Sequence, residues 1–228
     1  MTPVKFKLLF LDKSNKVQLH FQERSKLEKI KYLRRHVDHQ RTRLFTAHWP
    51  NLPGEILHDL AGIFHEYSAK RKTVLTAEGE VEKYLYLVLE GVQRAYAIST
   101  DGREATLVFT YAPSFSGVAD SFLLQRPSRY WFETLTPSKF LRANFQDFDA
   151  VLLKHPLLER LIRLALSETL EGVLVRQIEL QSYTAEQRFR TLLARSPHLL
   201  QLVPHKYIAN YLGMDATNFS KLLGQIRI

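Results

Sequence analysis

Residues 78–102 read EGEVEKYLYLVLEGVQRAYAISTDG, and this stretch decides the fold class. It holds two mainly apolar runs, 84–89 and 92–98. A Glu-Gly pair separates the runs, and an Asp-Gly pair follows the second. Strand-type composition between such turn residues is typical of β-hairpins, and Asp-Gly is a strong hairpin signal. The stretch therefore predicts antiparallel strands joined by tight turns.

Further short strands are predicted on both sides of this stretch. At near-regular spacing, with turn residues between them, the candidate strands are 73–76, 106–110, 130–135 and 140–143. Several short strands spaced in this way are typical of a small antiparallel barrel or sandwich. We assign residues 51–150 to this β-domain and expect one short helix at its start, over residues 52–69.

A long apolar segment, residues 151–183, follows the strands. Its apolar residues cover much more than half of a helix circumference, whereas a helix with one solvent face needs a single stripe. Two partners would explain this pattern: the β-domain on one side and a second copy of the helix on the other. Leu161, Ala165 and Gly172 are expected at that contact, because small residues seven positions apart let helices approach closely. The alternative is the core helix of a monomer.

The segment 184–228 predicts short helices with a basic outer face. Thr184-Ala185-Glu186-Gln187 has the spacing of a capping box and opens a helix. Pro204 favours the start of another helix, Gly213 ends it, and Asp215 can cap the next. Two short helices joined by a turn that contains glycine are typical of a helix-turn-helix. Three-helix domains that do not touch DNA share this outline.

The first 50 residues form a basic N-terminal extension in this interpretation. Residues 4–21 alternate around a polar turn and predict a hairpin. Residues 25–49 predict a basic amphipathic helix, which could dock on its own domain or touch DNA or lipid.

Composition limits the classes of protein that fit. The chain has 228 residues, 45% of them hydrophobic and 24% charged, as in ordinary globular proteins. It has no cysteine, which excludes disulfides, thiolate metal sites and cysteine nucleophiles. It has no run of 18 apolar residues and no signal-peptide pattern, so we expect a cytoplasmic protein without membrane association.

The net charge of +9 is unevenly distributed. Residues 1–50 hold 12 Lys/Arg against 4 Asp/Glu, residues 51–183 hold 14 against 17, and residues 184–228 hold 6 against 2. An acidic middle thus lies between two basic ends. Basic ends favour a polyanionic partner such as nucleic acid, although uneven surface charge alone is a simpler explanation.

The sequence gives little support for catalysis or for a metal. Gly-rich phosphate loops, a nucleophile elbow and zincin motifs are all absent from it. His36 and His39 lie three residues apart without an evident third ligand, and His58 and His65 could share a helix face but are most simply surface residues. We therefore predict that the protein is not an enzyme and holds no metal or other cofactor.

The order of a small β-barrel, a long apolar helix and a basic helix-turn-helix is specific. With the barrel pattern of residues 78–91 and the segment VPHKYIANYLGM at 203–214, the chain resembles the Crp/Fnr family of bacterial transcription regulators, in the short form of Bacteroidetes-like members. The resemblance covers residues 52–228. It implies an α+β fold with an N-terminal cyclic-nucleotide-binding-like antiparallel β-barrel of the jelly-roll type and a long dimerisation helix. A C-terminal winged-helix-like helix-turn-helix that lacks most of the wing would complete it.

The expected ligand segment departs from the family pattern. Residues 115–130 lie where the family has its phosphate-binding cassette, in which a Glu takes the ribose hydroxyl and an Arg pairs with the cyclic phosphate. Val118 and Ser128 stand at these two places, and neither can supply that contact. The resemblance therefore implies an effector other than cyclic AMP, or an empty barrel. Asp120 and Arg129 could substitute in a shorter loop, and the candidate pocket residues are Gly117, Asp120, Ser121, Ser128 and Arg129.

The last helix would read DNA in this family. Ala216, Thr217 and Lys221 match positions where relatives carry the Arg and Glu that read a G-rich half-site, so a different operator is expected. Asn218 could read adenine. The implied DNA-binding residues are Thr217, Asn218 and Lys221 at the bases, and His205, Lys206, Gln225 and Arg227 mainly at phosphates.

These patterns together predict a cytoplasmic, homodimeric transcription regulator that binds double-stranded DNA. Its effector would be an unidentified small molecule, and a shift between two orientations of the DNA-binding helices would regulate it. The alternative is a ligand-binding or protein-interaction module with the same barrel that no longer binds DNA specifically.

Overall fold

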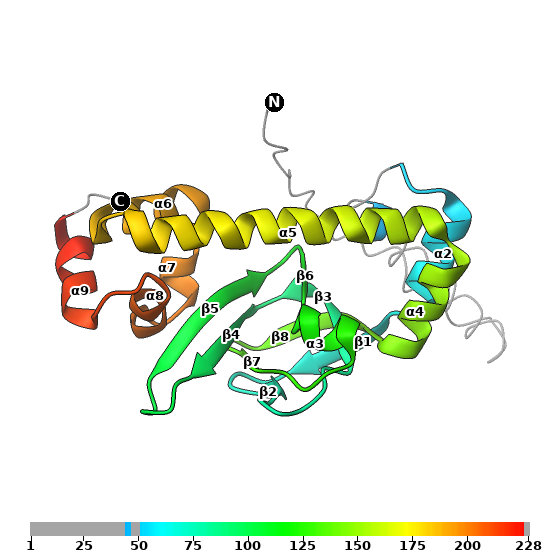
Figure 1. The fold of residues 1–228 in the computed structure, drawn as a ribbon, viewed down its shortest axis with the longest axis horizontal. Helices are drawn as coiled ribbons and strands as arrows, with labels where there is room; N and C mark the ends of the chain where they lie inside the picture. The colour runs from blue at the N-terminus through cyan, green and yellow to red at the C-terminus, as the bar shows by residue number, and fades with distance from the viewer. Residues whose placement is uncertain (1–43, 47–50, 226–228) are drawn as a thin grey trace, which may run out of the picture. The chain divides into compact units, whose positions relative to one another are not determined.

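The computed structural model describes residues 44–46 and 51–225 (Figure 1). The chain divides into two compact units, Met1–Asn51 and Leu52–Ile228. The hairpin predicted over 4–21 lies outside the described residues, and of the helix predicted over 25–49 only residues 44–46 are described, as a helical stretch. All the labelled strands and helices belong to the second unit.

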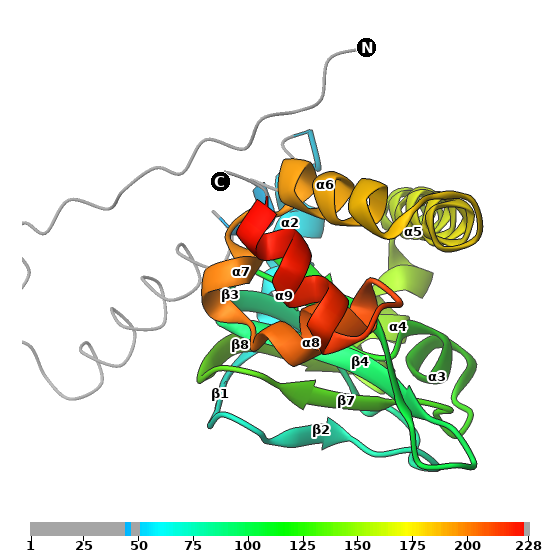
Figure 2. The ribbon, with the colours of Figure 1, turned by 90° about the vertical axis from the view of Figure 1, so that its left-hand side faces the viewer.

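Two four-stranded antiparallel sheets form the β-domain (Figures 1 and 2). One has the strand order β1-β8-β3-β6, and the other has the order β2-β7-β4-β5. The strand bounds are β1 His65–Ala69, β2 Val74–Thr76, β3 Tyr84–Glu90, β4 Val92–Ile98, β5 Glu104–Tyr111, β6 Ser114–Ser116, β7 Trp131–Thr134 and β8 Ser138–Asn144. The antiparallel β-domain predicted from the sequence is therefore present.

Tight turns lie where glycine allows them. Asp101-Gly102 closes the β4–β5 hairpin, in which Ile98 pairs with Glu104. Gly91 joins β3 to β4 with a φ of +93°, and a Cβ at this position would come within 2.6 Å of the Pro137 carbonyl oxygen. Both the left-handed backbone and the close approach require glycine. The pairs that predicted the hairpins are thus the residues that make their turns.

Aromatic side chains fill the space between the two sheets. The Tyr86 ring on β3 packs edge-on against Phe140 on β8, with ring centroids 5.2 Å apart. It also lies 5.9 Å from the Phe132 ring on β7. All three side chains are buried, and burial of each contributes about 1.5–3 kcal/mol to stability. These strands therefore share one core.

Helices precede and follow the strands, and a short one lies among them. Their bounds are α2 Gly54–Ile63, α3 Ala119–Leu124, α4 Phe145–Lys154, α5 Pro156–Ser182, α6 Ala185–Arg195, α7 Leu199–Leu202, α8 His205–Tyr211 and α9 Ala216–Gln225. Figure 1 shows α5 running along one side of the β-domain toward α6–α9. Within the described residues, no helix combines the length and hydropathy that a membrane crossing needs.

Two predicted helices differ from those observed. The single helix expected over 52–69 ends at Ile63, because His65–Ala69 pairs with β8 as strand β1. The long helix expected over 151–183 is interrupted at His155. Pro156 disfavours helical backbone at the residue before it and lacks an N–H for a helical hydrogen bond. The segment therefore forms two helices, α4 and α5, and α5 begins at the proline.

A second hydrophobic core joins the β-domain to the C-terminal helices. From the strands and their turns it contains Val92, Phe109 and Leu135. From the helices it contains Phe189, Leu192, Leu199, Val203, Ile208, Ala209, Leu212 and Phe219. The helices α6–α9 therefore pack as one unit with β4 and β5.

Candidate functional site

Three residues set the geometry of the turn between α8 and α9 and the position of α9. Gly213 in this turn has a φ of +65°, a conformation that favours glycine. Asp215 caps α9, because its Oδ1 accepts the Asn218 backbone N–H at 2.8 Å. Phe219 is buried, with its ring centroid 5.3 Å from that of Phe189 on α6. These contacts anchor α9 along one side and leave its other side open to solvent.

The residues expected to read bases lie on the open side of α9. Thr217, Asn218 and Lys221 are exposed, and so is Gln225 in the last turn. The Asn218 Nδ2 donates to the Asp215 Oδ2 at 2.7 Å, which orients the carboxamide at the start of the helix. Arg227 lies outside the described residues.

The expected phosphate contacts His205 and Lys206 lie in the first turn of α8, and both are exposed. The His205 ring lies 5.4 Å from the Phe219 ring, and the Lys206 Nζ lies 4.7 Å from the Tyr207 ring centroid. The structure thus brings the six described DNA-binding candidates together on two neighbouring helices.

Large apolar side chains of α5 are exposed in the single chain. Leu170 and Val173 are each 59% exposed, and Leu174 and Ile178 are each 55% exposed. Other exposed apolar residues of this helix are Leu157, Leu164, Leu166, Val175 and Leu180. An apolar surface of this extent is typical of surfaces that contact another molecule.

The residues singled out for helix pairing lie in one stripe of α5. Ala165 and Gly172 are exposed, whereas Leu158 and Glu179, seven positions before and after them, are buried against the chain itself. Leu161 is half-buried. A Cβ at position 172 would meet nothing within 4 Å. The middle of the stripe is therefore open, and the larger exposed side chains flank it.

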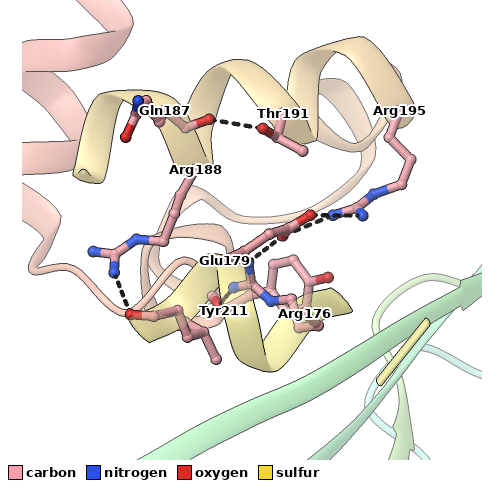
Figure 3. A network of polar contacts seen from close by, with 8 residues as sticks. Arg176, Glu179, Gln187, Arg188, Thr191, Arg195 and Tyr211 are labelled. Carbon is pink, nitrogen blue, oxygen red and sulfur yellow. Dashed lines mark hydrogen bonds and ion pairs between the residues drawn. The ribbon is translucent and has the colours of Figure 1, made fainter. Parts of the chain in front are cut away.

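The C-terminal end of α5 is tied to α6 by buried Glu179 (Figure 3). Its carboxylate accepts from Arg176 at 2.9 Å and from Arg195 on α6 at 3.2 Å. Burial alone would raise the pKa of Glu179, but the hydrogen bonds from Arg176 and Arg195 outweigh it and lower this pKa. The carboxylate therefore stays ionised and holds the two helices together.

Arginines of α5 and α6 also hold the turn between α8 and α9, and Figure 3 shows the contact of Arg176 with Tyr211. The Arg176 guanidinium donates to the Tyr211 carbonyl and lies 4.1 Å from the Tyr211 ring centroid. Arg188 donates to the Gly213 carbonyl at 3.3 Å and to the Leu180 carbonyl at 3.1 Å. Carbonyl groups at helix ends need such partners. The orientation of α8 and α9 therefore depends on α5 and α6.

A buried arginine of β4 docks α8 on the β-domain. The Arg94 side chain is 2% exposed and forms ion pairs of 2.7 Å with both Glu104 and Glu133. Its guanidinium lies between two tyrosine rings, 3.9 Å from the centroid of Tyr96 and 3.9 Å from that of Tyr207 on α8. A charge removed from water requires such pairing. Arg94 therefore joins the sheet to the first of the two candidate DNA-binding helices.

A second polar contact fixes α8 on the edge strand β5. The Asn210 Oδ1 accepts the Thr106 backbone N–H at 2.5 Å, and the Asn210 Nδ2 donates to the Glu104 carbonyl at 2.6 Å. The carboxamide therefore satisfies backbone groups that a neighbouring strand would otherwise pair. Sequence reasoning missed this contact and the role of Arg94, because the partners are distant in the chain and no local pattern signals them.

A buried carboxylate fills the backbone turn of the expected ligand segment. Glu82 is 1% exposed, and its Oε2 accepts from the Thr76 hydroxyl at 2.6 Å and from the Val118 N–H at 3.2 Å. Its Oε1 accepts the Tyr84 N–H at 3.2 Å. Burial raises the pKa of Glu82, and the hydrogen bonds to it only partly oppose this. The Val118 N–H, at the start of α3, is therefore already occupied by the protein's own carboxylate.

The five predicted pocket residues lie at the start of α3 and in the segment that follows this helix. Ser121 and Ser128 are buried and form hydrogen bonds with nearby backbone groups. Gly117 is half-buried, and Asp120 and Arg129 are exposed. A cavity of about 250 Å³ opens elsewhere in the barrel, between β1, β2, β3 and β8, and none of the five lines it.

The histidines of the described region do not form a metal site. His58 lies on α2 and His65 lies on β1, so the two do not share a helix face. In the part of the chain that the structure describes, no three His, Asp or Glu side chains are placed to hold a metal ion.

Comparisons with known proteins agree with this architecture. Residues 66–155 match the family described as Cyclic nucleotide-binding domain. FixK2 from Bradyrhizobium japonicum is similar in structure, with a TM-score of 0.64 and 18% identity over 72% of this chain and 84% of that one. A transcriptional regulator of the Crp/Fnr family from Eubacterium rectale has a TM-score of 0.62 and 15% identity over 78% and 84%. The chain has the Crp/Fnr fold.

The same Crp/Fnr fold occurs in a regulator described as responsive to c-di-GMP. This protein, CLP from Xanthomonas campestris, has a TM-score of 0.58 and 16% identity over 76% of this chain and 91% of that one. Comparison with curated protein sequences gives no match. The resemblance predicted from the sequence is thus confirmed, and it rests on the family match and on the fold.

Proposed function

We propose that the protein is a homodimeric DNA-binding transcription regulator of the Crp/Fnr type. The observation that carries this proposal is the open side of α9, which presents Thr217, Asn218 and Lys221 while Phe219 anchors the helix from behind. The first turn of such a recognition helix fits the major groove of B-DNA. The likeness to solved regulators supports the same function.

The exposed apolar surface of α5 supports dimerisation. Pairing of two α5 helices would remove side chains such as Leu170, Val173 and Ile178 from water, with about 25 cal/mol gained for each Å² of apolar area buried. A two-fold axis along α5 would relate two copies of α9. The operator would then be a two-fold symmetric site with half-sites about one helical turn apart.

Regulation would act on the docking of α8. This helix contacts the sheet through Arg94 and Asn210, and its end is held by Arg176 of α5. An effector bound in the barrel could therefore shift the population between two orientations of α8 and α9. Cyclic AMP is not the expected effector, because Glu82 occupies the Val118 N–H and no arginine stands at Ser128.

Binding to mixed double-stranded DNA fragments tests the proposal. We expect retention at about 50 mM salt and a loss of affinity of at least tenfold at about 200 mM, because phosphate contacts release counterions. Light scattering of the same preparation should give the mass of a dimer. Absence of DNA retention at low salt would overturn the regulator proposal.

The second candidate function is a ligand-binding or protein-interaction module. Ala216 and Thr217 favour it, because neither can read guanine as a bidentate arginine does. Under this candidate the protein would still be dimeric, but DNA would not be retained even at low salt.

A further inference from the structure

The barrel cavity contains an arginine clamped between two tyrosines. The Arg142 guanidinium lies 3.8 Å from the ring centroid of Tyr67 and 4.0 Å from that of Tyr84. Tyr67 belongs to β1, Tyr84 to β3 and Arg142 to β8, and all three line the cavity. The guanidinium also hydrogen-bonds the Tyr86 side chain, which lines the same cavity. A guanidinium has five N–H donors, so this one bond leaves donors for a further partner.

Arg142 has no ion-pair partner among residues 44–46 and 51–225. The other arginines packed on tyrosine rings differ, because Arg94 pairs with Glu104 and Glu133 and Arg176 pairs with Glu179. A half-buried guanidinium has five N–H donors and needs acceptors for them. The cavity therefore offers an anion a pre-oriented partner.

The other residues that line the cavity indicate the size and chemistry of such an anion. Burial raises the pKa of Tyr86, and the charge of Glu82 raises it further, so the phenol stays protonated and can donate. Val74, Leu75 and Val81 supply aliphatic surface in the same cavity. A ligand of about 250 Å³ or less with an anionic head and a short apolar body fits these groups.

The charges favour a single negative charge on the ligand. Arg142 and Lys83 line the cavity together with the carboxylate of Glu80, and buried Glu82 lies close enough to influence Tyr86. A dianion such as phosphate would be repelled more strongly by these carboxylates. The two oxygens of a carboxylate match the guanidinium edge in a bidentate pair.

We propose that this cavity binds a small organic monocarboxylate, with Arg142 as its bidentate partner. This cavity adjoins the turn at Val118 through Thr76 and Glu82, but none of the residues predicted for the ligand segment lines it. This proposal rests on the proposed function in one respect only. If the protein is a transcription regulator, the bound carboxylate is its effector.

Calorimetric titration of the full chain with sodium butyrate, sodium benzoate and sodium phosphate at constant ionic strength tests the proposal. We expect butyrate or benzoate to bind at millimolar concentration or better and phosphate to bind at least tenfold more weakly. Arg142→Gln should weaken carboxylate binding at least tenfold. Arg142→Lys should also weaken it, because lysine keeps the charge and loses the bidentate geometry. The exposed Arg103→Gln, in the β4–β5 turn, is the matched control and should bind as the wild type does.

The outcomes separate this proposal from the proposed function. If neither carboxylate binds better than chloride, if phosphate binds more tightly, or if Arg142→Gln and Arg142→Lys both bind as well as the wild type, the proposal is wrong. Should Arg142→Gln fail to fold, Tyr84→Phe and Arg142→Lys test the same cavity. The titration uses no DNA, so carboxylate binding by a protein that does not retain DNA would remove only the regulator function.

Discussion

The pKa values of two buried carboxylates, Glu179 and Glu82, shift in opposite directions because their neighbours differ. Glu179 accepts from two arginines, which lower its pKa despite burial, and it joins α5 to α6. Glu82 accepts from a hydroxyl and from backbone N–H groups, and burial raises its pKa. Neither role is visible in the sequence, since each depends on partners that folding brings together. The contrast gives a prediction at the scale of a single residue.

Replacing Glu82 with Gln should remove one source of pH dependence. A carboxyl whose pKa is higher in the folded state binds an extra proton there, between its unfolded and folded pKa values. Its stabilising contribution is full below the unfolded pKa of about 4.3 and is lost as the pH rises through the folded pKa. We expect the free energy of unfolding of the wild type to fall relative to Glu82→Gln as the pH rises above about 4. Urea unfolding across this range measures it, and parallel pH profiles would contradict it.

Local sequence patterns correctly predicted the helices whose caps are made by residues close together in the chain. The capping box at Thr184 forms, with the Gln187 Oε1 accepting the Thr184 N–H at 2.8 Å, and Asp215 caps α9 as expected. Strand β1 was missed because its pairing with β8 joins residues more than 60 positions apart, and its own composition resembles the end of a helix. Element boundaries therefore followed the sequence only where the cap or turn was local.

The helix α9 carries a prediction about DNA recognition. Asn218→Ala should weaken binding to the best operator by about 1–3 kcal/mol, because Asn218 lies in the exposed first turn of α9. The same change should relax the base preference at one base pair. Lys206→Ala, on α8, should weaken binding to all DNA sequences alike. It should also reduce, by about one, the slope of the logarithm of the binding constant against the logarithm of the salt concentration. Selection of binding sites from random DNA, with titrations at several salt concentrations, measures both. If only the Lys206 change alters base preference, α9 is not the helix in the groove.

The helix α5 carries a prediction about assembly. Leu164 is 46% exposed and Val173 is 59% exposed, and the two lie on opposite flanks of the stripe that contains Ala165 and Gly172. A glutamate at either position places a charge in the proposed helix pair, so we expect Leu164→Glu or Val173→Glu to yield monomers in light scattering. Thr100→Glu, at an exposed position in the β4–β5 turn outside α5, is the control and should remain dimeric. A monomeric wild type at micromolar concentration would show that the apolar surface does not mediate dimerisation.

At the scale of the molecule, the β-domain and the C-terminal helices are not independent. The sequence predicted both and their order, and the structural likeness to Crp/Fnr regulators agrees with that order. It did not predict the contacts between them, which use Arg94, Asn210 and the core around Phe109. Nor did it predict the cavity, because Tyr67, Tyr84 and Arg142 come from three separate strands. These contacts couple the β-domain to the C-terminal helices.

Asn210 gives the most direct test of this coupling. Its carboxamide bridges the Thr106 N–H and the Glu104 carbonyl, and each such hydrogen bond contributes about 0.5–1.5 kcal/mol. In Asn210→Ala both bonds are lost, so α8 should separate from β5 more often. We expect amide hydrogen exchange at Thr106 and along α8 to become about tenfold faster, since tenfold corresponds to about 1.4 kcal/mol. Exchange in the β3–β8 pairing should stay unchanged. Asn218→Ala is the control, because the Asn218 carboxamide bonds within the capped start of α9 and does not touch the sheet. Equal exchange of α8 in Asn210→Ala and the wild type would show that the core alone holds the helix, and the effector would then have to act through α5.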